Sequence, residues 1–113
     1  MALNEIFKIG KSISLPVPAN TKSGDPVRVG VLNGVAIVDE GTGFNKDNWT
    51  SVDLFGGHLF EIEDAGTATV GTPVYITSAG ALTLTATSNK LYGAITHKHR
   101  GDEVVVLVQS ISV

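Results

Sequence analysis

The spacing of turn residues is the feature that most limits what this chain can fold into. Runs rich in Val, Ile, Thr and Leu are separated by Gly, Pro, Asn or Asp at intervals of about eight to twelve residues, a spacing typical of a β-sandwich or a small β-barrel. The apolar periodicity of helices is nearly absent. We therefore predict an all-β fold, a small single-domain barrel or sandwich. The expected strands are 12–17, 27–31, 35–38, 51–55, 58–63, 73–77, 82–85, 91–97 and 103–109.

The stretch SGDPVRVGVLNGVAIV, residues 23–38, contains the strongest turn signals. The valines on either side of Arg28 share one face of a strand, and Arg28 points the other way. Asn33-Gly34 favours the positive φ angles of a tight hairpin, so we predict the turn there. A phosphate-binding loop is disfavoured, because the residues after Gly34 favour a strand over the helix such a loop precedes. A second hairpin is predicted through residues 78–80.

Composition excludes several classes of protein. The chain has 113 residues, of which 42% are hydrophobic and 17% charged, which suits one ordered domain with its own core. Its apolar stretches are too interrupted to cross a bilayer or to serve as a secretory signal. The net charge is −3 and the eight Lys and Arg residues are scattered, whereas nucleic-acid binding needs a clustered basic surface. The absence of cysteine removes disulfides and thiolate metal sites.

The amino-terminal segment, residues 1–11, carries several large apolar side chains ahead of the first predicted strand. It precedes Pro16 and Pro18, and prolines are placed at sheet edges rather than in interior strands. We predict that residues 1–11 form an arm that docks on another surface, ahead of a β domain over residues 12–113. An edge strand that covers the barrel mouth is the alternative. The candidate contact residues of the arm are Leu3, Ile6, Phe7 and Ile9.

The run Glu103–Gln109 is apolar on both alternating faces over its middle. Neither face can be left in water cheaply, so one should meet the core and the other a partner subunit or a second sheet. The candidate residues for an oligomer interface are Val104, Val106 and Val108. In the irregular segment 39–50, Phe44 and Trp49 are expected to fold back as a lid on the core, with an exposed anchor for a partner as the alternative.

Candidate nucleotide and metal sites are incomplete. Gly10-Lys11-Ser12 is similar to the end of a phosphate-binding loop, but the glycine required five places earlier is Glu5. His97 and His99 share a face if they lie in a strand, and zinc binding would need a third ligand. A solvated strand end is the plainer interpretation of the two histidines. The possible third ligands are His58, Asp102 and Glu103.

Covalent catalysis has no candidate nucleophile, because the chain lacks cysteine and places no Ser or Thr in a recognisable nucleophile motif. We therefore predict no catalytic, cofactor or metal site, and a protein that is not an enzyme.

An ordered series of turn-and-strand elements resembles a family of bacteriophage capsid cement proteins, also called head decoration proteins. Members are often labelled predicted phage recombinases, a label that the incomplete phosphate loop contradicts for this sequence. The elements span roughly residues 12 to 110. They are the segments 23–27, 30–36, 70–75, 80–83, 91–93 and 104–108.

The resemblance implies a small β domain on the outer surface of an icosahedral head, made in the bacterial cytoplasm. It also implies trimers at three-fold or quasi-three-fold positions that brace neighbouring major capsid subunits. The scattered basic residues and interrupted apolar stretches predict that neither nucleic acid nor a membrane is a partner. Such a role needs contact surface rather than catalysis. The alternative is a carbohydrate- or receptor-binding module on the virion surface, which would use exposed aromatics such as Trp49, Phe44, Tyr75 and Tyr92 for stacking.

Overall fold

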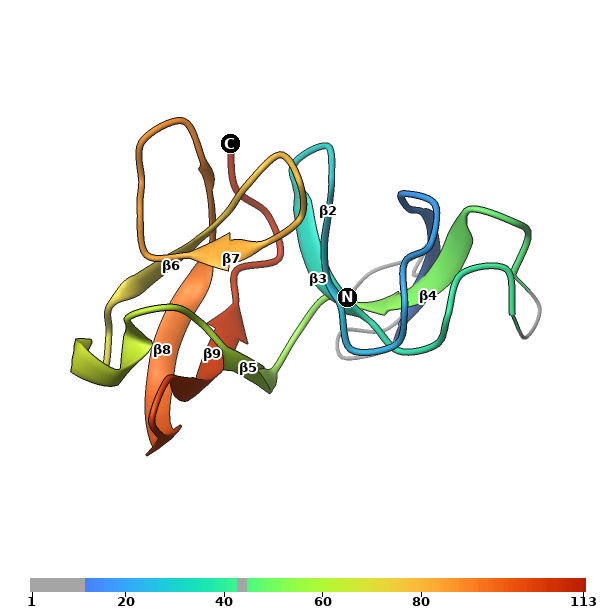
Figure 1. Cartoon of the computed structure of the whole chain (residues 1–113). Coiled ribbons are helices and arrows are strands. Elements are labelled where there is room, and N and C mark those ends of the chain that lie inside the picture. The colour runs from blue at the N-terminus through green and yellow to red at the C-terminus, as the bar shows by residue number, and fades with distance from the viewer. Residues whose placement is uncertain (1–11, 43–44) are drawn as a thin grey trace, which may run out of the picture.

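Two curled antiparallel sheets, each a half-barrel, form a single domain in the computed structural model, which describes residues 12–42 and 45–113 (Figure 1). The first sheet has the strand order β1-β4-β3-β2 and the second has the order β5-β9-β8-β6-β7. The first sheet contains β1 (Ile13–Pro16), β2 (Pro26–Val29), β3 (Leu32–Ala36) and β4 (Trp49–Asp53). The second contains β5 (Gly57–Glu61), β6 (Pro73–Ile76), β7 (Leu82–Thr83), β8 (Lys90–Arg100) and β9 (Glu103–Val108).

The predicted all-β fold is confirmed, and each predicted strand is present with bounds shifted by a few residues. The β6–β7 hairpin turns through residues 78–80 as expected. A short 3₁₀ helix, η1 (Ala65–Thr67), follows β5. Within the described residues, the helical content is too short to cross a membrane.

Each sheet packs over a core of its own. The larger core lies on the second sheet and includes Tyr92, Ile95 and the inward valines of β9, while Val35 of the first sheet joins it. The smaller core lies within the first sheet and is built around Val27, Val52 and Leu54. The two halves of the molecule are therefore held together by the contacts between the sheets as well as by the chain that links β4 to β5.

The prediction of a hairpin turn at Asn33-Gly34 is wrong. Val29 pairs with Leu32, so the two-residue turn is Gly30-Val31, and Gly30 has the positive φ of 62°. Asn33 and Gly34 lie inside β3, where both are buried. Gly34 serves close packing instead of a turn, because a Cβ there would collide with the Val52 side chain and the carbonyl of Asp53. Contacts with distant strands override the local turn signal.

The three valines predicted to form an oligomer interface face the core instead. Val104 and Val106 are fully buried and Val108 is nearly so, within the chain's own fold. Alternation along β9 then points Val105 and Leu107 to the opposite side, where Leu107 is 50% exposed. The prediction that only one face of this strand meets the core agrees with this arrangement. The prediction that Val104, Val106 and Val108 lie on the other face is wrong.

Candidate functional site

The histidines considered as zinc ligands do not converge on a site. Bulges in β8 shift the register between Ile95 and His97 and again between Lys98 and Arg100. The Nδ1 atom of His99 lies 3.0 Å from a carboxylate oxygen of Glu103, in an exposed pair at the end of the β8–β9 hairpin. Among residues 12–42 and 45–113, no three His, Cys, Asp or Glu side chains are grouped to hold a metal ion.

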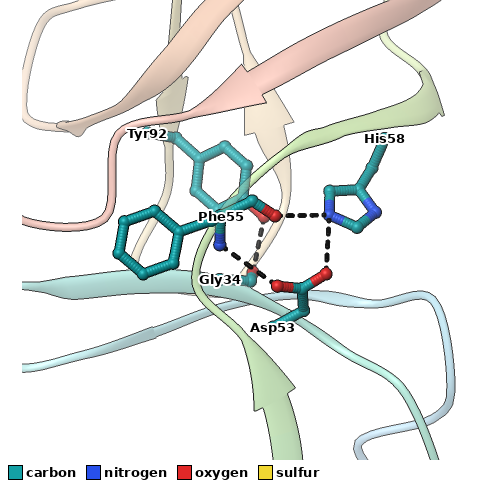
Figure 2. A network of polar contacts seen from close by, with 5 residues as sticks. All are labelled: Gly34, Asp53, Phe55, His58 and Tyr92. Carbon is teal, nitrogen blue, oxygen red and sulfur yellow. Dashed lines mark hydrogen bonds and ion pairs between the residues drawn. The ribbon is translucent and has the colours of Figure 1, made fainter. Parts of the chain in front are cut away.

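His58, the other histidine considered, braces the connection between the two sheets (Figure 2). Its Nε2 atom lies 3.3 Å from the carbonyl oxygen of Phe55 and 3.5 Å from a carboxylate oxygen of Asp53. The other carboxylate oxygen of Asp53 accepts a hydrogen bond from the Phe55 N–H at 3.2 Å. These contacts fix the short link from β4 to β5, which is a structural role.

Asn33 is the centre of a polar junction between the sheets. Its side-chain amide donates to the carbonyl of Leu91 at 3.0 Å and to that of Gln109 at 2.8 Å. Its side-chain oxygen accepts from Nη1 of Arg28 at 2.9 Å. A buried amide has to be hydrogen-bonded in this way, because leaving it unpaired carries a desolvation penalty. The sequence pattern did not reveal this role, since Asn followed by Gly is also the strongest hairpin signal.

Arg28 joins the junction to the carboxy-terminal segment. Its guanidinium donates to the hydroxyl of Ser112 at 2.6 Å and to the Ser112 carbonyl at 2.8 Å. The Ser112 N–H in turn donates to the carbonyl of Val31 at 2.9 Å, and Ile111 forms a β-bridge with Leu32. Residues 111–112 therefore close the contact between the sheets, and the single positive charge of the 23–38 stretch is used inside the molecule.

Tyr92 supplies another buried polar contact between the sheets. Its hydroxyl donates to the carbonyl of Gly34 at 2.5 Å (Figure 2), and its ring packs edge-on against Phe60 at a centroid distance of 6.1 Å. Burial raises the pKa of the Tyr92 hydroxyl well above its ordinary value. Within the described part of the chain, every buried side-chain nitrogen or oxygen has a partner, so the interior polar groups are engaged in structure.

Part of the exposed apolar surface lies on the outer face of the second sheet, while other exposed apolar side chains, such as Val70 and Ile111, lie elsewhere. We use "outer face" for the side of this sheet that carries Leu59 on β5 and Val105 and Leu107 on β9. Leu59 pairs with Val105 across the ladder, and Ala94 of β8 lies beside Leu107. Leu59 is 53% exposed and Leu107 is 50% exposed. These side chains place exposed apolar surface on two neighbouring strands, and exposed apolar patches mark interaction sites when they are large.

The other candidate contact residues have mixed outcomes. Leu3, Ile6, Phe7 and Ile9 lie outside the described residues, as do Phe44 and most of the Gly10-Lys11-Ser12 motif. Trp49 lies on β4 opposite Pro16 and is 38% exposed. The expected lid over the core is therefore wrong for Trp49, which lies at the surface.

An open groove runs between the two sheets on another side of the molecule. One wall is β2 with the loop that precedes it, and the other is the end of β6 with the turn that leads to β7. Most of the exposed residues that the structure describes along the groove are small, and none of them is charged. They are Pro18, Ala19, Asn20, Ser78, Ala79 and Ala81.

Comparison with known proteins gives one assignment. The sequence matches the family described as phage cement protein over residues 7–110, which is most of its length. No curated protein and no solved structure gives a match. The match covers both sheets, the outer face and the groove. The chain therefore belongs to the phage cement protein family, a family of virion structural proteins that associate with the phage capsid.

Proposed function

We propose that this protein decorates the outer surface of a phage head as a homotrimer and stabilises contacts between neighbouring major capsid subunits. The observation that carries the proposal is the apolar outer face of the second sheet, in a chain that belongs to the cement family. Binding to assembled subunits in preference to separated ones shifts the equilibrium toward the intact shell. This role requires contact surface and no catalytic group, and we infer that the protein is not an enzyme.

The outer face is the proposed contact between copies of the chain. Leu59 and Leu107 are each about half exposed and lie at diagonal positions on neighbouring strands. Burying the exposed half of each side chain stabilises by about 0.8–1.5 kcal/mol, half of the value for a fully exposed one. The outer face replaces Val104, Val106 and Val108 as the proposed interface, because those valines are already buried in the core.

A charge on the outer face tests this assignment. We expect Leu107→Glu to convert the trimer to a monomer in sedimentation equilibrium at micromolar concentration, because the carboxylate would be buried without a partner. The matched control is Val70→Glu, since Val70 is 64% exposed and lies outside the strands of the outer face. A wild-type protein that sediments as a monomer would remove the trimer from the proposal.

The amino-terminal segment is the proposed contact with the shell. Its apolar residues Leu3, Ile6, Phe7 and Ile9 suit addition of a strand to a free sheet edge of the capsid. We expect deletion of residues 1–11 to weaken co-sedimentation with purified expanded heads, with the trimer unchanged as the control. Full binding by the shortened protein would exclude the arm as a capsid contact.

A carbohydrate- or receptor-binding role has less support. Sugar stacking needs exposed aromatic rings, and Tyr92 is fully buried while Tyr75 is partly so. Trp49 is the exposed aromatic among the described residues. A glycan array that gives no signal, alongside co-sedimentation with heads, would favour the cement role.

A further inference from the structure

The groove between the sheets has a volume of about 450 Å³, within the size range of clefts that bind ligands. It runs along β2, with the turn between β6 and β7 on its other side, and Figure 1 shows this turn beside the β2–β3 hairpin. The lining comes from both halves of the molecule. A ligand held there would contact both sheets at once.

The β2 wall offers free backbone groups. Among the strands that the structure describes, β2 is an edge strand, paired on one side with β3. Val29 and Leu32 flank the two-residue turn and form a hydrogen-bonded pair, and pairing alternates along an antiparallel ladder. The N–H and carbonyl of Arg28 therefore point away from β3, while Pro26 adds an outward carbonyl without an N–H. An unpaired edge of this kind is a template for an added strand.

The charged side chains of the groove are already engaged. The Arg28 guanidinium donates to Asn33 and Ser112, and a carboxylate oxygen of Asp25 accepts from the Lys22 N–H at 2.9 Å. The exposed lining that remains consists of small side chains such as Ala79 and Ala81. What the groove presents to a ligand is backbone hydrogen bonding with little steric obstruction, which suits an extended polypeptide.

We infer that the groove binds an extended segment of the major capsid protein as an added strand on β2. The inference rests on the proposed function, and the capsid is the partner that the family assignment supplies. The lining that the described residues form carries no aromatic ring for a sugar. The same described residues include no cluster of free basic groups for nucleic acid. The groove is thus a second proposed capsid contact beside the amino-terminal segment, and it is separate from the outer face that we propose joins copies of this chain.

Filling the groove tests the inference. Ala79 is exposed in the turn between β6 and β7, so Ala79→Trp adds bulk without disturbing a core. We expect it to weaken binding to purified expanded heads at least about tenfold in a co-sedimentation titration. Val70→Trp is the matched control, since Val70 is 64% exposed and does not line the groove.

A second measurement identifies the occupant. With a photo-crosslinking amino acid in place of Ala79, irradiation on decorated heads is expected to yield an adduct with the major capsid protein, identified by mass spectrometry. An adduct with a second copy of this chain, or equal head binding by Ala79→Trp and the wild type, would overturn the groove assignment alone. A wild-type protein that does not bind heads would overturn the proposed function and this inference together.

Discussion

Replacing Asn33 with alanine tests whether the polar junction holds the two sheets together. The side chain is fully buried and makes four hydrogen bonds, three in which its amide group donates and one in which its oxygen accepts. In Asn33→Ala, the carbonyl of Leu91 keeps the Ser112 hydroxyl at 2.6 Å, and Arg28 keeps its two bonds to Ser112. The carbonyl of Gln109 loses the donor that Asn33 supplies.

The magnitude follows from these contacts. A carbonyl that loses its donor away from water costs about 1–3 kcal/mol, and each other hydrogen bond that is lost costs about 0.5–1.5 kcal/mol. We expect Asn33→Ala to lower the free energy of unfolding by about 3–5 kcal/mol, a large fraction of the roughly 5–15 kcal/mol typical of a domain.

Urea unfolding followed by circular dichroism measures the change, and an unaltered slope would show that the denatured state is unaffected. The control is Asn89→Ala, because the Asn89 amide donates to the Thr85 carbonyl at an exposed position. We expect that variant to lose less than about 1 kcal/mol. If Asn33→Ala were no less stable than Asn89→Ala, the junction would not be a main source of cohesion between the sheets.

Two further changes probe the second sheet. Gly93→Ala should destabilise severely or prevent folding, because a Cβ there would collide with the Leu107 carbonyl; a thermal midpoint equal to that of the wild type would contradict this. For Tyr92, the ordinary pKa of 10.0 applies to the unfolded chain, and burial raises the pKa in the folded state. Its contribution to the free energy of unfolding is therefore complete below pH 10 and is lost as the pH rises above that value. Between pH 9 and pH 11 the wild type should lose about 1.4 kcal/mol from this group. Tyr92→Phe should lack that loss in urea titrations at the two pH values, with Tyr75→Phe as the control.

Much of the fold could be predicted from local chemistry. The strands of both sheets follow from alternating apolar residues between Gly, Pro, Asn and Asp, and that information is contained in short windows. The turn of the β2–β3 hairpin could not be predicted in this way. Asn33 is drawn into β3 by carbonyls of Leu91 and Gln109, which lie 58 and 76 residues away in the sequence. A dipeptide signal carries no information about such partners.

The sequence allowed us to predict that β9 has a second apolar face, but not which of its residues form that face. The pattern of β9 shows that apolar surface is left over, because both of its faces are apolar. It does not show which face lies inward, since a one-residue shift exchanges them. The neighbours decide: β5 and β8 flank β9 in a register that puts Val106 between His58 and Ile95. The groove was not predicted, because it arises where β2 meets a turn about fifty residues further along the chain.

The contact of Ser112 with Arg28 bears on how the protein forms during synthesis. Ribosomes release the chain from its amino terminus onward, so early segments fold while later ones are still being made. Both sheets precede Ser112 in the chain, yet its hydroxyl and backbone complete the bonding of Arg28 and Val31. The first half-barrel can therefore collapse early, whereas the second needs β9, which ends shortly before Ser112. Completion of the second sheet and the locking of the two sheets therefore both come late in synthesis.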